Sequence, residues 1–147
     1  MEDQRKDHKF IDLNKIDNED ENQSSIVLYT EINYLKYLLM ADADEVTEKA
    51  IIKDYPLLEA DILKASHHGS KTGSSEVFLD TIQPLIGIFS CGHYSIYHHP
   101  NPETIQRFLK RHIHYYSTYE EGDLMIIPLY KMNVLLTSSG YSIIKWK

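Results

Sequence analysis

A carboxylate and two histidine pairs follow apolar runs at three places in this sequence. Asp42 follows the run YLLMA, the pair His67-His68 follows DILKAS, and the pair His98-His99 lies in YHHPNPE. Carboxylate oxygens and imidazole nitrogens are ligands that zinc and manganese accept. Imidazoles beside a helix start also suit phosphate binding. The residue types therefore indicate metal or phosphate chemistry, provided that the fold brings them together.

The first histidine pair opens the segment HHGSKTGSS. Successive side chains on an extended backbone point opposite ways, so we expect one of the two histidines to face the site. The other is then expected to pack or to donate a supporting hydrogen bond. Gly69 permits a sharp turn, because glycine tolerates positive φ. Ser70, Lys71 and the amides after them are placed to bind an anion near the next helix start.

Each of these residues also has an interpretation that needs no ligand. Either Asp42 or Asp44 is a suitable N-cap for the helix that DADEVTEKAIIKDYP predicts. His98 and His99 fit a rigid proline-rich turn with side chains facing solvent. Agreement among the three places is what favours metal or phosphate chemistry over these alternatives.

Bulk properties limit the class of protein. The chain has 147 residues and a net charge of −7, which argues against holding nucleic acid by broad basic attraction. A local basic site remains compatible with this charge. Cys91 is the single cysteine, so neither an internal disulfide nor a cysteine-built zinc site is expected. The apolar runs are too short to span a bilayer, and we expect a soluble, cytoplasmic chain.

Hydrophobic patterning predicts the elements that must position these residues. We expect residues 1–24 to be a polar segment with at most one short strand, at KFIDL, and residues 25–147 to be the folded unit. SSIVLYTEI and YLKYLLMA predict a β-hairpin. Helices are expected at DADEVTEKAIIKDYP, at SSEVFLDTIQP with Ser74 as cap, and at NPETIQRFLKRHI with Asn101 as cap; strands are expected at ADILKAS and LIGIFSCG, with three or four more after residue 113.

This order predicts an α/β layered fold with a mixed sheet. In such sheets, ligands collect at the carboxyl ends of strands. Asp42, the pair His67-His68 and the segment Cys91-Gly92-His93 each follow a predicted strand. We therefore expect Asp42, His67 and one of His98 or His99 to converge at one edge of the sheet.

The order of the motifs resembles the metallo-β-lactamase-fold domain of ComEC-type competence proteins, which take part in DNA uptake in bacteria. LLMADADE, ADILKASHHGSKTGSS and IFSCGHYSIYHHPNPETIQRF match, in order, the family's Gly-Asp-Ala, Leu-Lys-Val-Gly/Pro-His-His-Gly-Ser and Tyr-Gly-His-Pro-His-Pro-Glu segments. The resemblance covers residues 22–123. This sequence departs from it at Ala41, His98 and Asn101, where the family has glycine, glycine and histidine.

By position, the resemblance implies a set of site residues. Asp42 matches the metal-bridging aspartate, His67 matches a metal ligand with His68 in support, and His99 matches the first histidine of the last segment. In the complete domain, a hydroxide bound to zinc or manganese attacks a phosphodiester. The resemblance then implies that His99 and Lys71 stabilise charge on the phosphate.

Two further residues are implied in substrate binding. Ser70 and His98 flank the same strand ends, together with Lys71, and are expected to contact the phosphodiester. Full-length relatives of this type are membrane-associated, which the resemblance alone implies.

The family's principal metal motif, HxHxDH or HxDxDH, has no full match in the sequence. Asp7-His8 imitates its final pair, but Asp3 and Arg5 stand where earlier ligands belong. The chain is therefore expected to be the C-terminal half of a metallo-β-lactamase-like αββα sandwich. Asp42 and His67 alone would leave a metal under-coordinated.

Three functions remain open at this point. The first is a metal-dependent phosphodiester hydrolase fragment associated with competence DNA uptake, with DNA or another phosphodiester as substrate. The second is a non-catalytic half-domain that serves as a binding or assembly module. The third is an unrelated α/β protein with accidental histidine pairs.

The expected partners follow from the half-domain hypothesis. One is a chain that supplies the missing N-terminal half. Another is a second copy, in a homodimer that covers apolar surface in runs such as MIIPLY and VLL. The alternative is that the terminal strands fold back and close the core.

Overall fold

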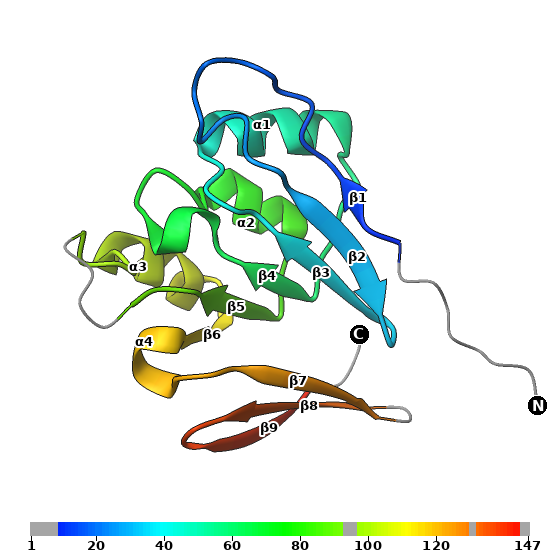
Figure 1. Cartoon of the computed structure of the whole chain (residues 1–147), viewed down its shortest axis with the longest axis vertical. Coiled ribbons are helices and arrows are strands. Elements are labelled where there is room, and N and C mark those ends of the chain that lie inside the picture. The colour runs from blue at the N-terminus through cyan, green and yellow to red at the C-terminus, as the bar shows by residue number, and fades with distance from the viewer. Residues whose placement is uncertain (1–8, 93–96, 130–131, 145–147) are drawn as a thin grey trace, which may run out of the picture.

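A mixed β-sheet forms the centre of the protein in the computed structural model, which describes residues 9–92, 97–129 and 132–144. Helices lie against one face of this six-stranded sheet, and a three-stranded antiparallel sheet lies against the other (Figure 1). The α/β layered class with a mixed sheet is therefore confirmed. His93 and the imitation motif at Asp3, Arg5 and Asp7-His8 lie outside the described residues.

The strands of the large sheet follow the chain order β1-β2-β3-β4-β5-β6. The first two pairings are antiparallel and the remaining three are parallel, so β3 to β6 end at the same edge. Its strands are β1 (Ile11–Asp12), β2 (Leu28–Ile32), β3 (Leu35–Leu39), β4 (Ile62–Lys64), β5 (Ile86–Phe89) and β6 (His114–Ser117). The helices are α1 (Glu45–Asp54), α2 (Glu76–Ile82), α3 (Pro102–Lys110) and α4 (Thr118–Glu121), with a 3₁₀ turn at Ser66–Gly69. The small sheet consists of β7 (Met125–Leu129), β8 (Met132–Thr137) and β9 (Gly140–Ile144).

The helix caps mostly agree with the sequence. Asn101 caps α3 by accepting a hydrogen bond from the Glu103 amide, and Pro102 begins the helix, as expected. The cap of α2 is Ser75 rather than the expected Ser74, because Ser75 has the extended backbone of an N-cap and accepts from the Phe78 amide.

The segment expected to be polar contributes to the fold in its described part. The short strand expected at KFIDL is confirmed as β1, which pairs with β2. Leu13 is buried in the core. The Asn14 side-chain amide donates to the carbonyl oxygens of Gln23 and Ser25, both at 2.7 Å. The Asn14 hydrogen bonds join the two ends of the loop between β1 and β2, and Leu13 anchors this loop to the core.

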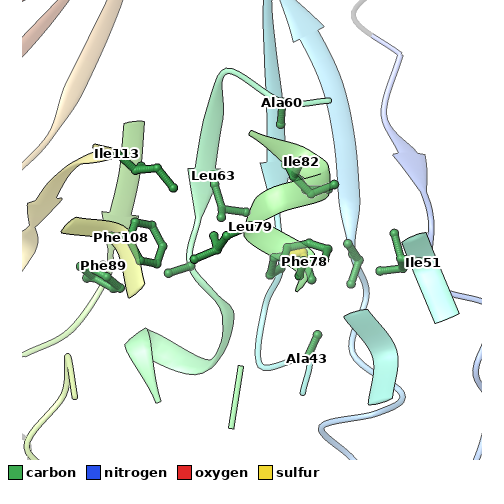
Figure 2. Packing of buried hydrophobic residues seen from close by; sticks show 14 of the residues in the cluster. Ala43, Ile51, Ala60, Leu63, Phe78, Leu79, Ile82, Phe89, Phe108 and Ile113 are labelled. Carbon is green, nitrogen blue, oxygen red and sulfur yellow. The ribbon is translucent and has the colours of Figure 1, made fainter. Parts of the chain in front are cut away.

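The core on the helical side is built around α2 and α3. Figure 2 shows Phe78 and Leu79 of α2 directed towards the sheet, with Leu79 beside Leu63 of β4. The rings of Phe108 and Phe89 pack with centroids 5.0 Å apart. Burying each such side chain stabilises the fold by roughly 1.5–3 kcal/mol. This packing fixes α2 and α3 above the ends of the parallel strands.

The small sheet closes the other side of the core. Leu135 of β8 and Ile144 of β9 are buried against Ile62 and Ile86 of the large sheet. The Asn33 side-chain amide, at the β2–β3 turn, also donates to the Leu129 carbonyl oxygen at 2.9 Å. The terminal strands therefore fold back over the large sheet, which was the alternative to an open inner face.

Candidate functional site: a histidine and carboxylate cluster at the strand ends

The site lies where the parallel strands β3, β4 and β5 end. Leu39 pairs with Lys64 and Lys64 pairs with Ile88, so the segments after these strands emerge side by side. The His67 amide donates to the Ala41 carbonyl oxygen at 3.0 Å, which joins the first two segments. The fold thus brings the Asp42 loop and the histidine turn together.

Asp42 and His68 form a direct side-chain pair at the site. Their Oδ1 and Nε2 atoms are 3.2 Å apart, and both side chains are about half exposed. His68 Nδ1 lies 2.5 Å from the Ser90 carbonyl oxygen. A carbonyl only accepts hydrogen bonds, so Nδ1 must donate, and in a neutral ring Nε2 then presents a lone pair to the carboxylate. Two acceptors facing each other require a proton or a cation between them.

Asp42 is available for this pair because the next aspartate serves as the helix cap. The Asp44 carboxylate accepts from the amides of Val46 at 2.9 Å and Thr47 at 3.1 Å. The choice between Asp42 and Asp44 as N-cap, open in the sequence, is therefore decided for Asp44.

The backbone of the histidine turn determines which histidine meets Asp42. His67 and His68 have φ angles of 45° and 56°, in the left-handed region, and do not lie on an extended segment. The strand-end position and the resemblance put His67 beside Asp42, and in the structure His68 is the histidine whose ring contacts the Asp42 carboxylate. Left-handed backbone costs a non-glycine residue roughly 1–2 kcal/mol. Such strain is concentrated at functional sites in proteins.

His67 and His99 form a second pair beside the first. Their ring centroids are 5.9 Å apart, and the ring of Tyr97 stacks on His99 at the same distance. Nδ1 of each histidine is buried and has no hydrogen-bond partner among the described residues. Burial, with smaller contributions from His67 and His68, lowers the pKa of His99. His99 is therefore held as a neutral imidazole with an unused polar atom.

The residues expected to bind an anion lie in three different environments. The Ser70 hydroxyl lies 3.0 Å from the Thr72 hydroxyl and accepts from the Thr72 amide, so it stabilises its own turn. Lys71 is exposed, and no contact between its ammonium group and the histidines occurs in the described part of the chain. His98 is exposed and lines a cavity of about 300 Å³ together with His99.

Lys64 is a site residue that the sequence did not single out. Its Nζ atom donates to the Ala41 carbonyl oxygen at 2.8 Å, directly before Asp42. Burial lowers the pKa of Lys64, and the nearby Asp42 carboxylate opposes this effect. A lysine within the apolar run DILKAS was the available signal, because a buried ammonium group needs a partner.

No protein-family model matches the chain. It is 33% identical over 103 residues, 70% of its length, to the ComE operon protein 3 of Bacillus subtilis (strain 168). It is 32% identical over 107 residues, 72% of its length, to the competence protein ComA of Neisseria gonorrhoeae. This chain is a relative of competence proteins.

The similarity covers a small part of those proteins. The chain spans 13% of the length of the Bacillus protein and 15% of the Neisseria protein. It is also 30% identical over 87 residues to recombination protein 2 of Haemophilus influenzae, of which it spans 11%. Among the residues that the structure describes, no helix is long and apolar enough to cross a membrane.

The described residues bring together a small set of possible metal donors. No group of three or more histidine, cysteine, aspartate or glutamate side chains is placed to hold a metal within residues 9–92, 97–129 and 132–144. Asp42 and His68 supply two facing donors, whereas zinc takes four ligands. A metal at this pair would need further ligands from outside the described residues.

Proposed function

We propose that this chain contributes half of a metal-dependent phosphodiester-hydrolysing site that acts in DNA uptake. The observation that carries the proposal is the Asp42–His68 pair, in which the Ser90 carbonyl fixes the ring so that Nε2 meets the carboxylate. Metal-binding histidines usually donate their other ring N–H to a carbonyl or carboxylate in this way. The similarity to the competence protein ComA and to the ComE operon protein 3 supports an association of this chain with DNA uptake.

The proposed architecture is the C-terminal half of a metallo-β-lactamase-like αββα sandwich. Helices, a mixed sheet and a second sheet are stacked in that order, which fits three of the four layers. The remaining ligands would come from another segment or another chain, with zinc or manganese as the metal. When bound, such a metal supplies Lewis acidity and an activated water.

The chain's own residues would orient the phosphodiester beside that centre. His99, held neutral by its surroundings, is proposed to contact the phosphate through an imidazole nitrogen. Lys71 and His98 are exposed at the rim of the site and are proposed to balance phosphate charge. His67 supports the turn and offers its buried Nδ1. Ser70 holds the turn that places these groups.

A non-catalytic binding or assembly module is the second candidate. The specific observation in its favour is the small donor set, since Asp42 and His68 fall short of the four ligands of a zinc site.

Replacing Asp42 or His68 should separate these functions in cells that carry the gene. If the site is enzymatic, Asp42→Ala and His68→Ala should each lower uptake of labelled DNA at least about ten-fold, because loss of a metal-site residue or its support typically costs 10–100-fold. Asp54→Ala is the matched control, since Asp54 pairs only with Lys15 at the surface among the described contacts. Uptake that survives both site changes but is lost on deletion of the gene would contradict the enzymatic role and support the module.

A further inference from the structure

The outer face of the small sheet is apolar along every strand. Ile127 of β7 pairs with Val134 of β8, which pairs with Ile143 of β9, and side chains two residues away share their face. The side chains of this outer face are Met125, Ile127, Leu129, Met132, Val134, Leu136, Tyr141 and Ile143. No charged residue occurs in these three strands. Figure 1 shows β7, β8 and β9 as the outermost layer, beyond the large sheet.

This face is exposed over a large area. Tyr141 is 73% exposed, Met125 59% and Ile143 53%. At such exposures the face presents roughly 600 Å² of apolar surface, the upper end of what monomeric proteins show in one patch. Two copies that pair through it would bury roughly 1,200 Å² in total, the area at which specific stable interfaces begin.

The composition of the sheet favours face pairing with an identical chain. The chain carries a net charge of −7, so two copies repel each other overall, and contact through an uncharged face adds no close pair of like charges. The edge strand β7 contains Pro128, which has no N–H to donate, and this disfavours pairing along that edge. Two apolar sheet faces, by contrast, pack well against each other at about 10 Å.

We infer that the outer face of β7–β9 binds a second copy of this chain in a two-fold dimer. Each copy covers the apolar face of the other, which gives a sandwich of two small sheets between two complete large sheets. The face lies on the side of the large sheet opposite the helices, and its residues are absent from the histidine and carboxylate cluster. The fourth layer of the proposed sandwich would cover this same face, so each copy takes the place of that layer for the other.

Light scattering coupled to size-exclusion chromatography at micromolar concentrations tests the dimer. The wild-type chain should have twice the mass of one chain. Ile143→Glu places two like charges inside the interface, which should raise the dimer dissociation constant at least about 100-fold. The matched control is Val77→Glu on α2, where valine is 61% exposed on the helical side and the dimer should persist. Unchanged circular dichroism spectra of both variants would show that the fold is kept.

A charge-pair experiment identifies the occupant of the face. A mixture of the Ile143→Glu and Ile143→Lys chains should recover the dimer mass that neither shows alone. A wild-type monomer would overturn the inference and leave the face to another partner. A dimer that survives Ile143→Glu would also overturn it, in favour of pairing along a strand edge, and a larger open-ended assembly would overturn the two-fold arrangement.

Discussion

Replacing Glu48 by alanine is expected to lower the free energy of unfolding by roughly 3 kcal/mol or more. Glu48 is fully buried, and its carboxylate accepts hydrogen bonds from the Ser66 hydroxyl at 2.8 Å and from the amides of Ser74 and Ser75 at 2.5 and 2.9 Å. Alanine leaves these three donors unpaired in the interior, and each costs roughly 1–3 kcal/mol. Burial raises the pKa of Glu48, so the carboxylate depends on these donors for its place in the core.

Urea unfolding of three variants measures this effect. Glu48→Gln keeps one acceptor oxygen but turns an N–H group towards the Ser75 amide. Its free energy of unfolding should therefore lie between those of wild type and Glu48→Ala. Glu45→Ala is the control on the same helix, because Glu45 is exposed and such changes usually stay within about 0.5 kcal/mol. Equal small losses for Glu48→Ala and Glu45→Ala would show that the buried carboxylate does not hold the segment that carries the histidine turn.

Gly69→Ala is expected to destabilise the protein by roughly 3 kcal/mol. Gly69 has a φ of +89°, and an added Cβ atom would lie 2.7 Å from both Phe89 Cδ1 and Pro100 Cβ. The Gly69 carbonyl also accepts from the Asn101 amide at 2.9 Å, so the turn and the His99 segment are in direct contact. The substitution therefore strains the backbone and pushes His99 away from His67.

Thermal unfolding compares this change with the same change at an open glycine. A Cβ atom at Gly92 would meet nothing within 4 Å, so Gly92→Ala should leave the melting temperature unchanged or slightly raised. Similar melting temperatures for Gly69→Ala and wild type would contradict the close packing between the histidine turn and the proline-rich segment.

The elements that local sequence controls were predictable. Asn101 and Pro102 begin α3 as their side chains require, and Gly69 takes the positive φ that the turn needs. The strands were also identified, since apolar runs such as DILKAS have no competing helical period. Within α3, Leu109 is 48% exposed, because the helix buries mainly Thr104 and Phe108.

The details of the site depended on backbone geometry that residue types do not specify. Two successive left-handed residues, rather than an extended chain, determine which of His67 and His68 contacts Asp42. The Asp44 cap is local, but two aspartates of the same segment suited an N-cap. Lys64 reaches the Ala41 carbonyl because segments that are distant in the sequence meet there.

The most direct test of the proposed half-site at Asp42 and His68 is nuclear magnetic resonance of the His68 ring nitrogens during a zinc titration of the isolated chain. Before zinc is added, Nδ1 should be protonated and hydrogen-bonded to the Ser90 carbonyl. Zinc should then shift the Nε2 signal with weak affinity, because two donors replace only half of a zinc site, and Asp42→Ala should remove the shift. Zinc binding that leaves His68 unaffected, or tight stoichiometric binding by this chain alone, would contradict the half-site.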